Sequence, residues 1–272
     1  MIKYSRIQVD YYQRNYNEES RLSTNKARMV EFYTTIRTLE NFIAPNSSIL
    51  DVGAGTGIYS LYLAEKGHLV TATDITPLHV DTIRKKVNEH KGNIRLEASV
   101  VDGRDLSRYK SESFDVVLCL GPLYHLISLN DRLKCISECL RVLKEDGMLF
   151  VAYINRHFVI TRIIKDNKDY LNEKWIDKII KDGFIKSDEN DCFWTDAYFH
   201  TPDEIEEFMN EHFGIKMIEN IAADGISTLM PDVIDNMNDE EYQVWLRYHF
   251  KTCREPSILG YSNHGLYVGR KL

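Results

Sequence analysis

The sequence predicts an α/β fold in which a doubly wound, mostly parallel sheet carries helices on both faces. Two observations lead to this prediction. Short apolar runs alternate with longer amphipathic stretches between residues 48 and 154, which is typical of strand-helix-strand units in a parallel sheet. The first apolar run ends in a glycine-rich turn, Asp51-Val-Gly53-Ala-Gly55-Thr-Gly57, which is typical of a strand that leads directly into a helix.

The expected elements follow this alternation in order. Residues 1–45 read as helical. We then expect strands at 48–53, 69–73, 94–98, 114–119 and 147–154, with helices at 57–66, 78–90 and 129–143. After residue 155 we expect a helical stretch at 156–183, a strand within 193–200, a helix at 203–212, a strand at 215–221, a helix at 238–252 and a strand at 265–271.

This order divides the 272 residues into parts of a single domain. Residues 46–154 and 201–272 would form the sheet core. Residues 1–45 would form an N-terminal helical cap, and residues 155–200 a lid inserted after the fifth strand. A hydrophobic content of 43% is ordinary for one globular domain of this size.

Composition also bears on location and metal binding. No apolar run reaches the roughly 18 residues of a membrane span, and the N-terminus has no apolar signal core. The five cysteines are scattered and odd in number, which favours a reducing compartment. We therefore expect a cytoplasmic protein that does not bind a membrane. Cys135 and Cys139 lie four residues apart on an expected helix; we interpret them as core residues and expect no metal, because a metal site needs further ligands nearby.

Acidic residues are concentrated in one part of the chain. Residues 155–252 contain 21 Asp or Glu and 11 Lys or Arg, a balance of −10, whereas the rest contains 20 and 23, a balance of +3. A face built from the acidic part would repel phosphate backbones, so we expect no nucleic-acid partner. Such a face would tolerate an amine, although an acidic segment is usually only a solvated surface.

The glycine turn and the two acids near it carry the first functional signal. A nucleoside could lie on the bare backbone of the turn, where Asp51 would repel a pyrophosphate and attract an ammonium or sulfonium group. This favours S-adenosylmethionine as the cofactor. Asp74 ends the second strand 17 residues after Gly57, where it could accept hydrogen bonds from a ribose. Alone, Asp74 could equally serve as a helix cap before Pro77.

From Ile49 to Asp74 the chain resembles the first motif and following acid of class I S-adenosylmethionine-dependent methyltransferases. Residues 101–106, 114–125, 141–151 and 265–271 are similar, in order, to the family's third-strand loop, fourth strand with its active-site loop, turn into the fifth strand, and last strand. The resemblance implies a Rossmann-like sheet of seven strands with an antiparallel last strand. Residues 155–250 match no motif, and substrate choice usually resides there.

The resemblance also implies a set of cofactor-binding residues. Asp102 maps onto the acid that meets the adenine amino group, with the Gly103 amide near the ring. The full expected set is Asp51, Gly53, Ala54, Gly55, Gly57, Asp74, Ile75, Asp102, Gly103, Leu120 and Gly121. The expected product is S-adenosylhomocysteine.

Catalysis could involve a histidine and a tyrosine after the fourth strand. Methyl transfer mainly requires the acceptor and methyl group to be held in line, with a base only where the acceptor must lose a proton. His125 is the best base candidate, although it could instead shape the pocket or cap a helix. Tyr124 could orient the acceptor or wall the site. His264 is interpreted as structural.

Candidate residues for acceptor binding are Tyr11, Tyr12, Tyr16 and His200. A tyrosine ring face attracts a sulfonium, so the three tyrosines could close over the cofactor. They could equally belong to an amphipathic helix that packs on the core. His200 opens the helix after the expected lid and could face the cleft.

We therefore expect an S-adenosylmethionine-dependent methyltransferase that transfers the methyl group to an O, N or C of a small molecule. Gly121-Pro-Leu-Tyr124 replaces the Asn-Pro-Pro-Tyr-type loop of the family's adenine- or glutamine-directed enzymes, which favours a small-molecule acceptor. The alternatives are a non-catalytic S-adenosylmethionine-binding protein, an RNA or protein methyltransferase, and an NAD-dependent oxidoreductase. Asp51 and the spacing of the third glycine argue against the last. The acceptor and the oligomeric state stay open.

Overall fold

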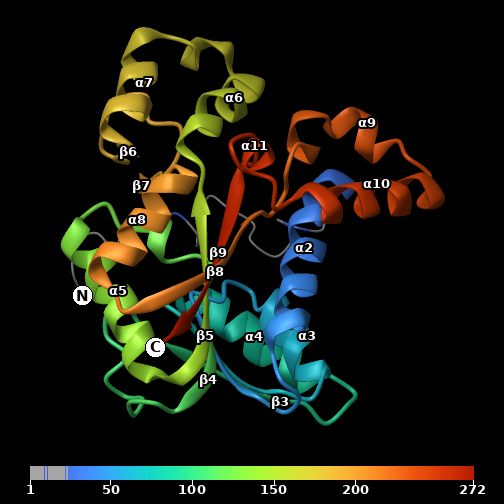
Figure 1. The fold of residues 1–272 in the computed structure, drawn as a ribbon, viewed down its shortest axis with the longest axis vertical. Helices are drawn as coiled ribbons and strands as arrows, with labels where there is room; N and C mark the ends of the chain where they lie inside the picture. Colours follow the sequence, from blue (N-terminus) through green and yellow to red (C-terminus); the bar gives the residue numbers. More distant parts are fainter. Residues whose placement is uncertain (1–8, 10, 12–21, 23) are drawn as a thin grey trace.

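The computed structural model describes residues 9, 11, 22 and 24–272, and its core is a seven-stranded sheet (Figure 1). The strand order is β3-β2-β1-β4-β5-β9-β8. The strands are β1 Ser48–Val52, β2 Leu69–Asp74, β3 Arg95–Val100, β4 Phe114–Cys119, β5 Leu143–Ile154, β8 Ile215–Ala222 and β9 His264–Lys271. Strands β1 to β5 pair in parallel, whereas β9 is antiparallel to both β5 and β8. The predicted fold class is confirmed.

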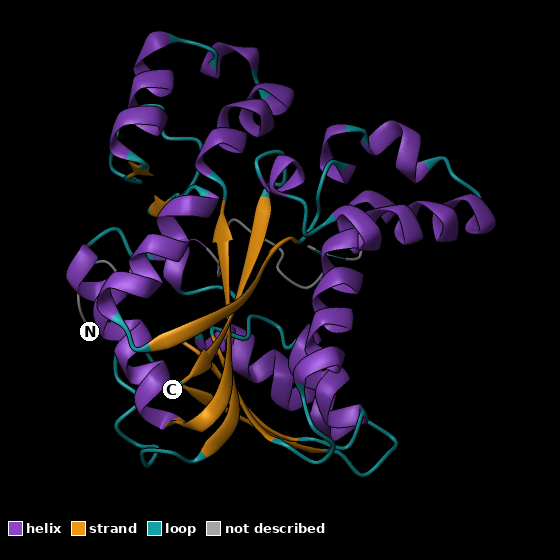
Figure 2. Cartoon of the chain, in the orientation of Figure 1, coloured by secondary structure: helices purple, strands orange, loops and turns teal. Residues whose placement is uncertain are grey.

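Helices cover both faces of the sheet (Figure 2). One face carries α2 Lys26–Phe42, α3 Ile58–Glu65 and α4 Pro77–Glu89, and the other carries α5 Leu129–Val142 and α8 Pro202–His212. Successive strand residues point to opposite faces, so Ile49 packs with the first group of helices and Leu50 with the second. Because both faces are buried, the central strands are mostly apolar and do not simply alternate apolar with polar residues.

The strand order reverses between β1 and β4. Crossover connections leave these two strands in opposite directions, which opens a crevice outside their carboxyl ends. The glycine turn follows β1, and the loop with the 3-10 turn η2, Leu123–His125, follows β4. The topology therefore places the two most informative loops of the sequence on opposite sides of one crevice.

After β5 the chain forms a separate segment at the top of Figure 1. Its elements are α6 Arg156–Asp166, η3 Lys168–Tyr170, α7 Glu173–Asp177, the π-helical turn η4 Lys178–Asp182, β6 Phe184–Ile185 and β7 Ala197–Tyr198. Trp175 and Ile179 are buried in its own apolar cluster. The expectation of one helical stretch at 156–183 is only partly right, because the side chains of Asn167 and Asn172 accept backbone hydrogen bonds and start new turns. The role of this segment as a lid stays a prediction.

The C-terminal part extends the core beside α2, at the right of Figure 1. Its helices are η5 Ser227–Leu229, α9 Pro231–Asp235, α10 Asp239–Thr252 and α11 Pro256–Leu259. Ile234 and Tyr242 pack against Val30 of α2. The short helices α9 and α11 were not expected, although each begins with a proline, a residue that suits the first helical turn. Among the described residues, no helix has the length and apolar character that crossing a membrane would need.

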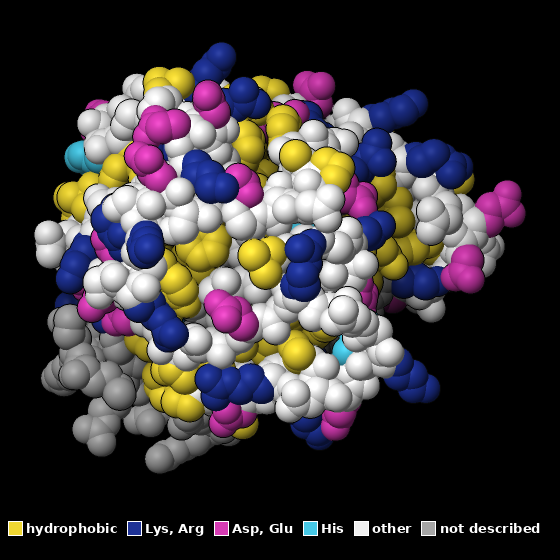
Figure 3. Space-filling view, turned by 90° about the horizontal axis from the view of Figure 1, so that it is seen from below, with side chains coloured by type: hydrophobic (Ala, Val, Ile, Leu, Met, Phe, Trp, Pro, Cys, Tyr) yellow, Lys and Arg dark blue, Asp and Glu magenta, His cyan; other side chains and the backbone are white. Residues whose placement is uncertain are grey.

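The end of the molecule opposite the α6–α7 segment carries charges of both signs. Figure 3 looks at this end from below and shows Lys and Arg side chains interspersed with Asp and Glu. A nucleic-acid surface is typically a continuous basic patch. The described part of this face does not present one.

Candidate active site

The turn after β1 consists of glycines in the left-handed backbone region. Gly53, Gly55 and Gly57 have φ values of 71°, 56° and 82°. A Cβ on Gly53 would lie 2.6 Å from Cδ of Pro122, and a Cβ on Gly57 would lie 2.7 Å from Cγ1 of Ile83. These positions therefore require glycine for both conformation and space.

Asp51 is a buried carboxyl group at the end of β1, and it is only 1% exposed. Ser60 Oγ donates a hydrogen bond of 2.6 Å to Asp51 Oδ2, whereas buried Oδ1 has no partner among the described residues. Burial raises the pKa of Asp51 to about 7; the bond from Ser60 opposes this rise, and the charge of Asp74 adds to it. A ligand that placed a positive group here would favour the ionised form.

Asp74, at the end of β2, fastens the glycine turn to the start of α4. Its Oδ2 accepts a hydrogen bond from the Gly55 amide at 2.9 Å, and its Oδ1 accepts one from the Thr76 amide at 2.7 Å. Nδ1 of buried His79 lies 3.2 Å from the same Oδ1. A carboxylate has about four acceptor positions, so Asp74 can order these loops and still accept a hydrogen bond from a ligand.

Asp102, in the loop after β3, is held by a two-point ion pair with Arg104. Arg104 Nε and Nη2 lie 3.0 Å and 2.6 Å from the two oxygens of Asp102, and Nη1 lies 3.3 Å from Asp131. Arg104 is only 4% exposed, and its hydrogen bond to Asp102 helps to raise its pKa further. The pair fixes the orientation of Asp102.

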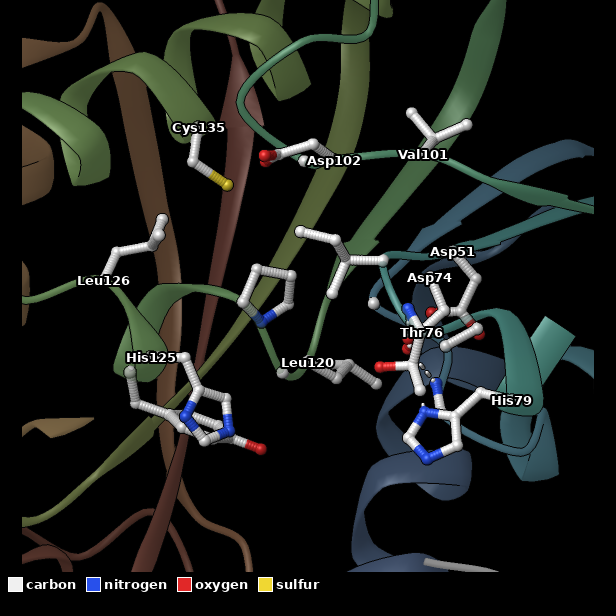
Figure 4. A pocket seen from close by; sticks show the side chains of 18 of the residues that line it. Asp51, Asp74, Thr76, His79, Val101, Asp102, Leu120, His125, Leu126 and Cys135 are labelled. Carbon is white, nitrogen blue, oxygen red and sulfur yellow. Dashed lines mark hydrogen bonds and ion pairs between the residues drawn. The ribbon is translucent and has the colours of Figure 1, made fainter. Parts of the chain in front are cut away.

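These groups surround one cavity at the carboxyl ends of the strands (Figure 4). In Figure 4, Asp51, Asp74 and His79 lie on one side of the cavity, His125 on the opposite side and Asp102 on a third. The expected cofactor residues that line it are Asp51, Gly53, Ala54, Gly55, Asp74, Ile75, Asp102, Gly103, Leu120 and Gly121. Gly57, the N-cap of α3, is not among the lining residues.

The cavity also has walls that the sequence reasoning did not identify. They are Ile58, Tyr59, Thr76, His79, Val101, Arg104, Pro122, Leu126 and Cys135. Arg104 stands inside a stretch already singled out, so an arginine two residues after a functional acid was the available signal. The apolar walls offered no such signal, because their sequence pattern is that of ordinary core residues.

His125 and Tyr124 border the cavity from the η2 turn. His125 Nδ1 lies 3.1 Å from the backbone carbonyl of Asp196, so this nitrogen carries the hydrogen and donates it. Burial lowers the pKa of His125 to about 4, despite this hydrogen bond and the charge of Asp74. A histidine with this pKa is a weak proton acceptor at pH 7. The geometry suits a wall that orients other groups, and the base role of His125 stays a prediction.

A second cavity of about 330 Å³ adjoins the first and shares Tyr124 with it. Its aromatic walls are Tyr11, Tyr124, Phe193, Trp194 and Phe199. Its polar and charged walls are Arg28, Glu31, Arg162, Asp166, Asp224, Thr228, Asn263 and His264. The volume suits a small molecule. His264, which was expected to be structural, therefore borders a cavity.

Of the remaining acceptor-binding candidates, the structure describes His200. His200 is 2% exposed and lines neither cavity. Burial and the charges of Arg132 and Arg156 lower the pKa of His200 to about 3, so it is a neutral, enclosed side chain. Tyr12 and Tyr16 are outside the described residues.

Two groups of described side chains place three potential metal-ligating atoms within 4.8 Å of one another. They are Cys119, Cys135 and Cys139, and Glu31, Asp224 and His264. A hydrogen bond with Cys119 and burial in the core both raise the pKa of Cys135 well above its usual range. In the second group, His264 Nδ1 lies 3.0 Å from Asp224 Oδ2 and 3.3 Å from Glu31 Oε2.

Comparison with protein families identifies the central part of the chain. Residues 50–151 match the family described as a methyltransferase domain. The matched stretch contains the glycine turn, Asp74, Asp102 and the η2 loop, and all the residues that line the first cavity lie within it. Most walls of the second cavity come from outside it.

Curated relatives of the methyltransferase domain act on different kinds of acceptor atom. The chain is 33% identical over 125 residues to a ubiquinone biosynthesis O-methyltransferase from Haemophilus ducreyi, a match over 45% of this chain and 52% of that protein. It is 35% identical over 155 residues to a glycine/sarcosine N-methyltransferase from Parasynechococcus marenigrum, over 54% of each chain. The chain thus spans about half the length of these relatives.

The likeness to a solved structure extends further along the chain. Magnesium protoporphyrin IX methyltransferase from Synechocystis PCC 6803, solved with bound SAH, superposes with a TM-score of 0.58. The match covers 99% of this chain and 100% of that chain at 14% sequence identity. At this identity the likeness shows the shared fold.

Proposed function

We propose that this protein is an S-adenosylmethionine-dependent methyltransferase that acts on a small molecule. The observation that carries the proposal is the buried Oδ1 of Asp51, which has no partner among the described residues and belongs to a wall of the first cavity. The methionine part of the cofactor brings an ammonium and a sulfonium, either of which would satisfy this carboxylate. The methyltransferase domain at residues 50–151 supports the same cofactor.

The other two acids suit the nucleoside part of the cofactor. Asp74 would accept hydrogen bonds from the ribose hydroxyls, and Asp102, oriented by Arg104, would accept one from the adenine amino group. A pyrophosphate suits this cavity less well, because Asp51 and Asp74 lie beside the glycine turn and would repel it. This argues against the NAD-dependent alternative.

The second cavity is the proposed site of the methyl acceptor. It shares Tyr124 with the first cavity, so molecules in the two cavities would meet near this ring. When bound, the cofactor supplies its methyl group as an electrophile. Tyr124 and Trp194, whose rings stack with centroids 6.3 Å apart, would hold the acceptor in line and exclude water.

The identity of the atom that accepts the methyl group depends on further evidence. The names of the curated relatives include an O-methyltransferase and an N-methyltransferase of small molecules, which supports a small-molecule acceptor and leaves O, N and C open. A non-catalytic protein that binds S-adenosylmethionine would have the same first cavity. Turnover of any acceptor separates that alternative from the enzyme.

Calorimetric titration with S-adenosylmethionine, S-adenosylhomocysteine and NAD tests the cofactor assignment. We expect S-adenosylmethionine and S-adenosylhomocysteine to bind and NAD not to bind. Asp74→Ala should weaken binding by about 1–3 kcal/mol, because hydrogen bonds to a charged acceptor are lost. Asp81→Ala is the matched control, since Asp81 is exposed on α4 and does not line the cavity. Binding of NAD alone would overturn the proposal.

A further inference from the structure

Two carboxylates from distant parts of the chain converge on one imidazole nitrogen at a wall of the second cavity. His264 is the first residue of β9, Asp224 follows β8, and Glu31 belongs to α2. His264 Nδ1 lies 3.0 Å from Asp224 Oδ2 and 3.3 Å from Glu31 Oε2. The ligand atoms of all three side chains lie within 4.8 Å of one another, and Asp224 is 1% exposed. Two acids therefore share one nitrogen in a largely enclosed place.

A fourth donor group stands beside the same nitrogen. The side-chain amide of Asn263 places its nitrogen 3.0 Å from His264 Nδ1. An amide also carries an oxygen, and half a turn about its last bond exchanges the two atoms. Asn263 can therefore offer an oxygen to a cation at this place. The donor set is then two carboxylates, one imidazole nitrogen and one amide oxygen.

The spacing of the three charged or titratable side chains suits a single metal ion. Ligand atoms that lie about 2.1 Å from an ion, at octahedral or tetrahedral angles to one another, are about 3.0–3.4 Å apart. The oxygens of Asp224 and Glu31 lie 3.0 and 3.3 Å from His264 Nδ1, within this range. The same distances suit hydrogen bonds from a protonated ring, so either a proton or a metal ion can bridge the cluster.

Charge distinguishes these two states. Burial would raise the pKa of Asp224, but the hydrogen bonds and charge of His264 and the hydrogen bond from Ser262 lower it overall. A positive group next to Asp224 thus stabilises its ionised form. Two carboxylates and a protonated ring sum to −1, whereas two carboxylates and a divalent ion on the neutral ring sum to zero. Metal binding would release the Nδ1 proton to solvent and balance the charges of the cluster.

The fold already holds one ligand oxygen in place. Asp224 Oδ1 accepts hydrogen bonds from Ser262 Oγ at 2.7 Å and from the backbone amides of Asn263 and His264 at 2.9 and 3.1 Å. These bonds leave Oδ2 directed at the imidazole. Metal ligands are commonly oriented in this way by hydrogen bonds to their other atoms. The cluster would therefore need little rearrangement to receive an ion.

The cluster also opens onto the second cavity. All four of its side chains line this cavity, so an ion has a route in and its water ligands have room. We propose that Glu31, Asp224 and His264 bind a divalent transition-metal ion in this wall of the cavity. The Asn263 amide or water would complete the coordination. An imidazole nitrogen among oxygen donors favours first-row ions such as Mn²⁺ and Zn²⁺ over Mg²⁺, which gives up its water ligands reluctantly.

This site goes beyond the proposed methyltransferase function and does not depend on it. The sequence offered no signal for it, because its ligands lie at positions 31, 224 and 264 and share no spacing motif. Two arginines line the same cavity, and Arg162 is paired with Asp166 at 2.7 Å. If the guanidinium of Arg28 serves the two carboxylates instead of a metal ion, the protein will not bind Mn²⁺ at this place.

Calorimetric titration of the EDTA-treated, full-length protein with Mn²⁺ tests the site. Mn²⁺ is the probe because it prefers oxygen and nitrogen donors to the cysteine thiols. We expect one ion to bind per chain, and Mg²⁺ to bind much more weakly. Glu31→Gln should weaken Mn²⁺ binding about 10-fold or more, because loss of even an outer partner of a metal ligand costs about 10–100-fold.

Glu40→Gln is the matched control, since Glu40 is exposed on the same helix and lines neither cavity. Its affinity for Mn²⁺ should equal that of the wild type. Equal affinities of Glu31→Gln and Glu40→Gln, or no saturable binding to the wild type, would overturn the proposal. Mg²⁺ that binds as tightly as Mn²⁺ would also overturn it, because the imidazole would then not be a ligand.

A second measurement uses only the wild-type protein, so it stands even if Glu31→Gln does not fold. Mn²⁺ is paramagnetic and broadens the NMR signals of nuclei near it. Small amounts of Mn²⁺ should broaden the imidazole signals of His264 well before those of His212. His212 ends α8 close to Ile215, which pairs with Lys271 at the other end of β9. Equal broadening of the two histidines would overturn the proposal.

Failure of the proposed function would look different. In that case S-adenosylmethionine would not bind to the metal-free protein, whereas the Mn²⁺ titration would be unchanged.

Discussion

Ser60 donates a hydrogen bond of 2.6 Å to Oδ2 of Asp51, while Oδ1 of the same buried carboxyl group has no partner among the described residues. The pair joins the end of β1 to α3 across the glycine turn. One oxygen is thus fixed by the fold, and the other is left for a ligand. The arrangement costs stability in the free protein, because burial disfavours the charged carboxylate.

Asp51 should make cofactor binding depend on pH. Burial raises the pKa of Asp51 to about 7 in the free protein, and a positively charged ligand binds the ionised form. Affinity for S-adenosylmethionine should therefore fall as pH decreases below about 7, by up to about tenfold per unit. Calorimetry between pH 5.5 and 8.5 measures this. A flat profile in that range would show that Asp51 does not face the charged part of the ligand.

Asp51→Asn should stabilise the free protein while weakening the cofactor complex. The folded pKa of Asp51 lies above its ordinary value, so the folded state binds the extra proton, and stability falls as pH rises from about 4 to about 7. The variant has no carboxyl group to ionise, so its free energy of unfolding at pH 8 should exceed that of the wild type by about 2–4 kcal/mol. Urea unfolding at pH 5 and pH 8 measures the difference. A variant less stable than the wild type at pH 8 would contradict the argument.

Arg104→Gln should weaken adenine recognition through Asp102. Arg104 holds both oxygens of Asp102 and lies 3.3 Å from Asp131, so its loss leaves two carboxylates facing each other without a cation. We expect about 1–3 kcal/mol lower stability and weaker binding of S-adenosylhomocysteine. Arg108→Gln is the control, since Arg108 is exposed in the same loop. Equal affinities of the two variants for S-adenosylhomocysteine would show that Arg104 does not contribute to adenine recognition.

His125→Ala should slow turnover without changing its pH profile. His125 packs 5.3 Å from the Trp194 ring and donates a hydrogen bond to the Asp196 carbonyl, so its loss loosens the wall between the cavities. Because burial lowers the pKa of His125 to about 4, its protonation lies outside the range of ordinary assays. We expect a several-fold lower kcat with cofactor affinity preserved. A changed midpoint in the pH profile of turnover would support His125 as the general base.

The sequence could predict the parts of this molecule that depend on local pattern. The buried strands, the glycine turn and the carboxylates of Asp51, Asp74 and Asp102 were placed correctly at one edge of the sheet, because parallel strands end at a common edge. The length of the helical stretch after Asn155 was wrong, because capping by Asn167 and Asn172 competes with helix continuation.

The Asp224–His264 pair was not predictable in the same way. Neither residue belongs to a recognised motif, and their approach depends on the pairing of β8 with β9 across 40 positions. The opposite error concerns His200, whose place next to a good helix start suggested exposure to the cleft. The structure instead buries it near Arg132 and Arg156.

Gly57→Ala should destabilise the glycine turn more than its backbone conformation alone explains. A Cβ at Gly57 meets both a φ of 82° and Cγ1 of Ile83 at 2.7 Å, whereas Gly67 has a φ of 93° with no atom within 4 Å. Gly67→Ala is therefore the matched control and should cost about 1 kcal/mol from φ strain. Gly57→Ala should cost about 2–4 kcal/mol, because overpacking against Ile83 adds to the strain. Urea unfolding of both variants measures the difference, and equal losses would show that Ile83 yields freely and that the turn needs glycine only for its φ.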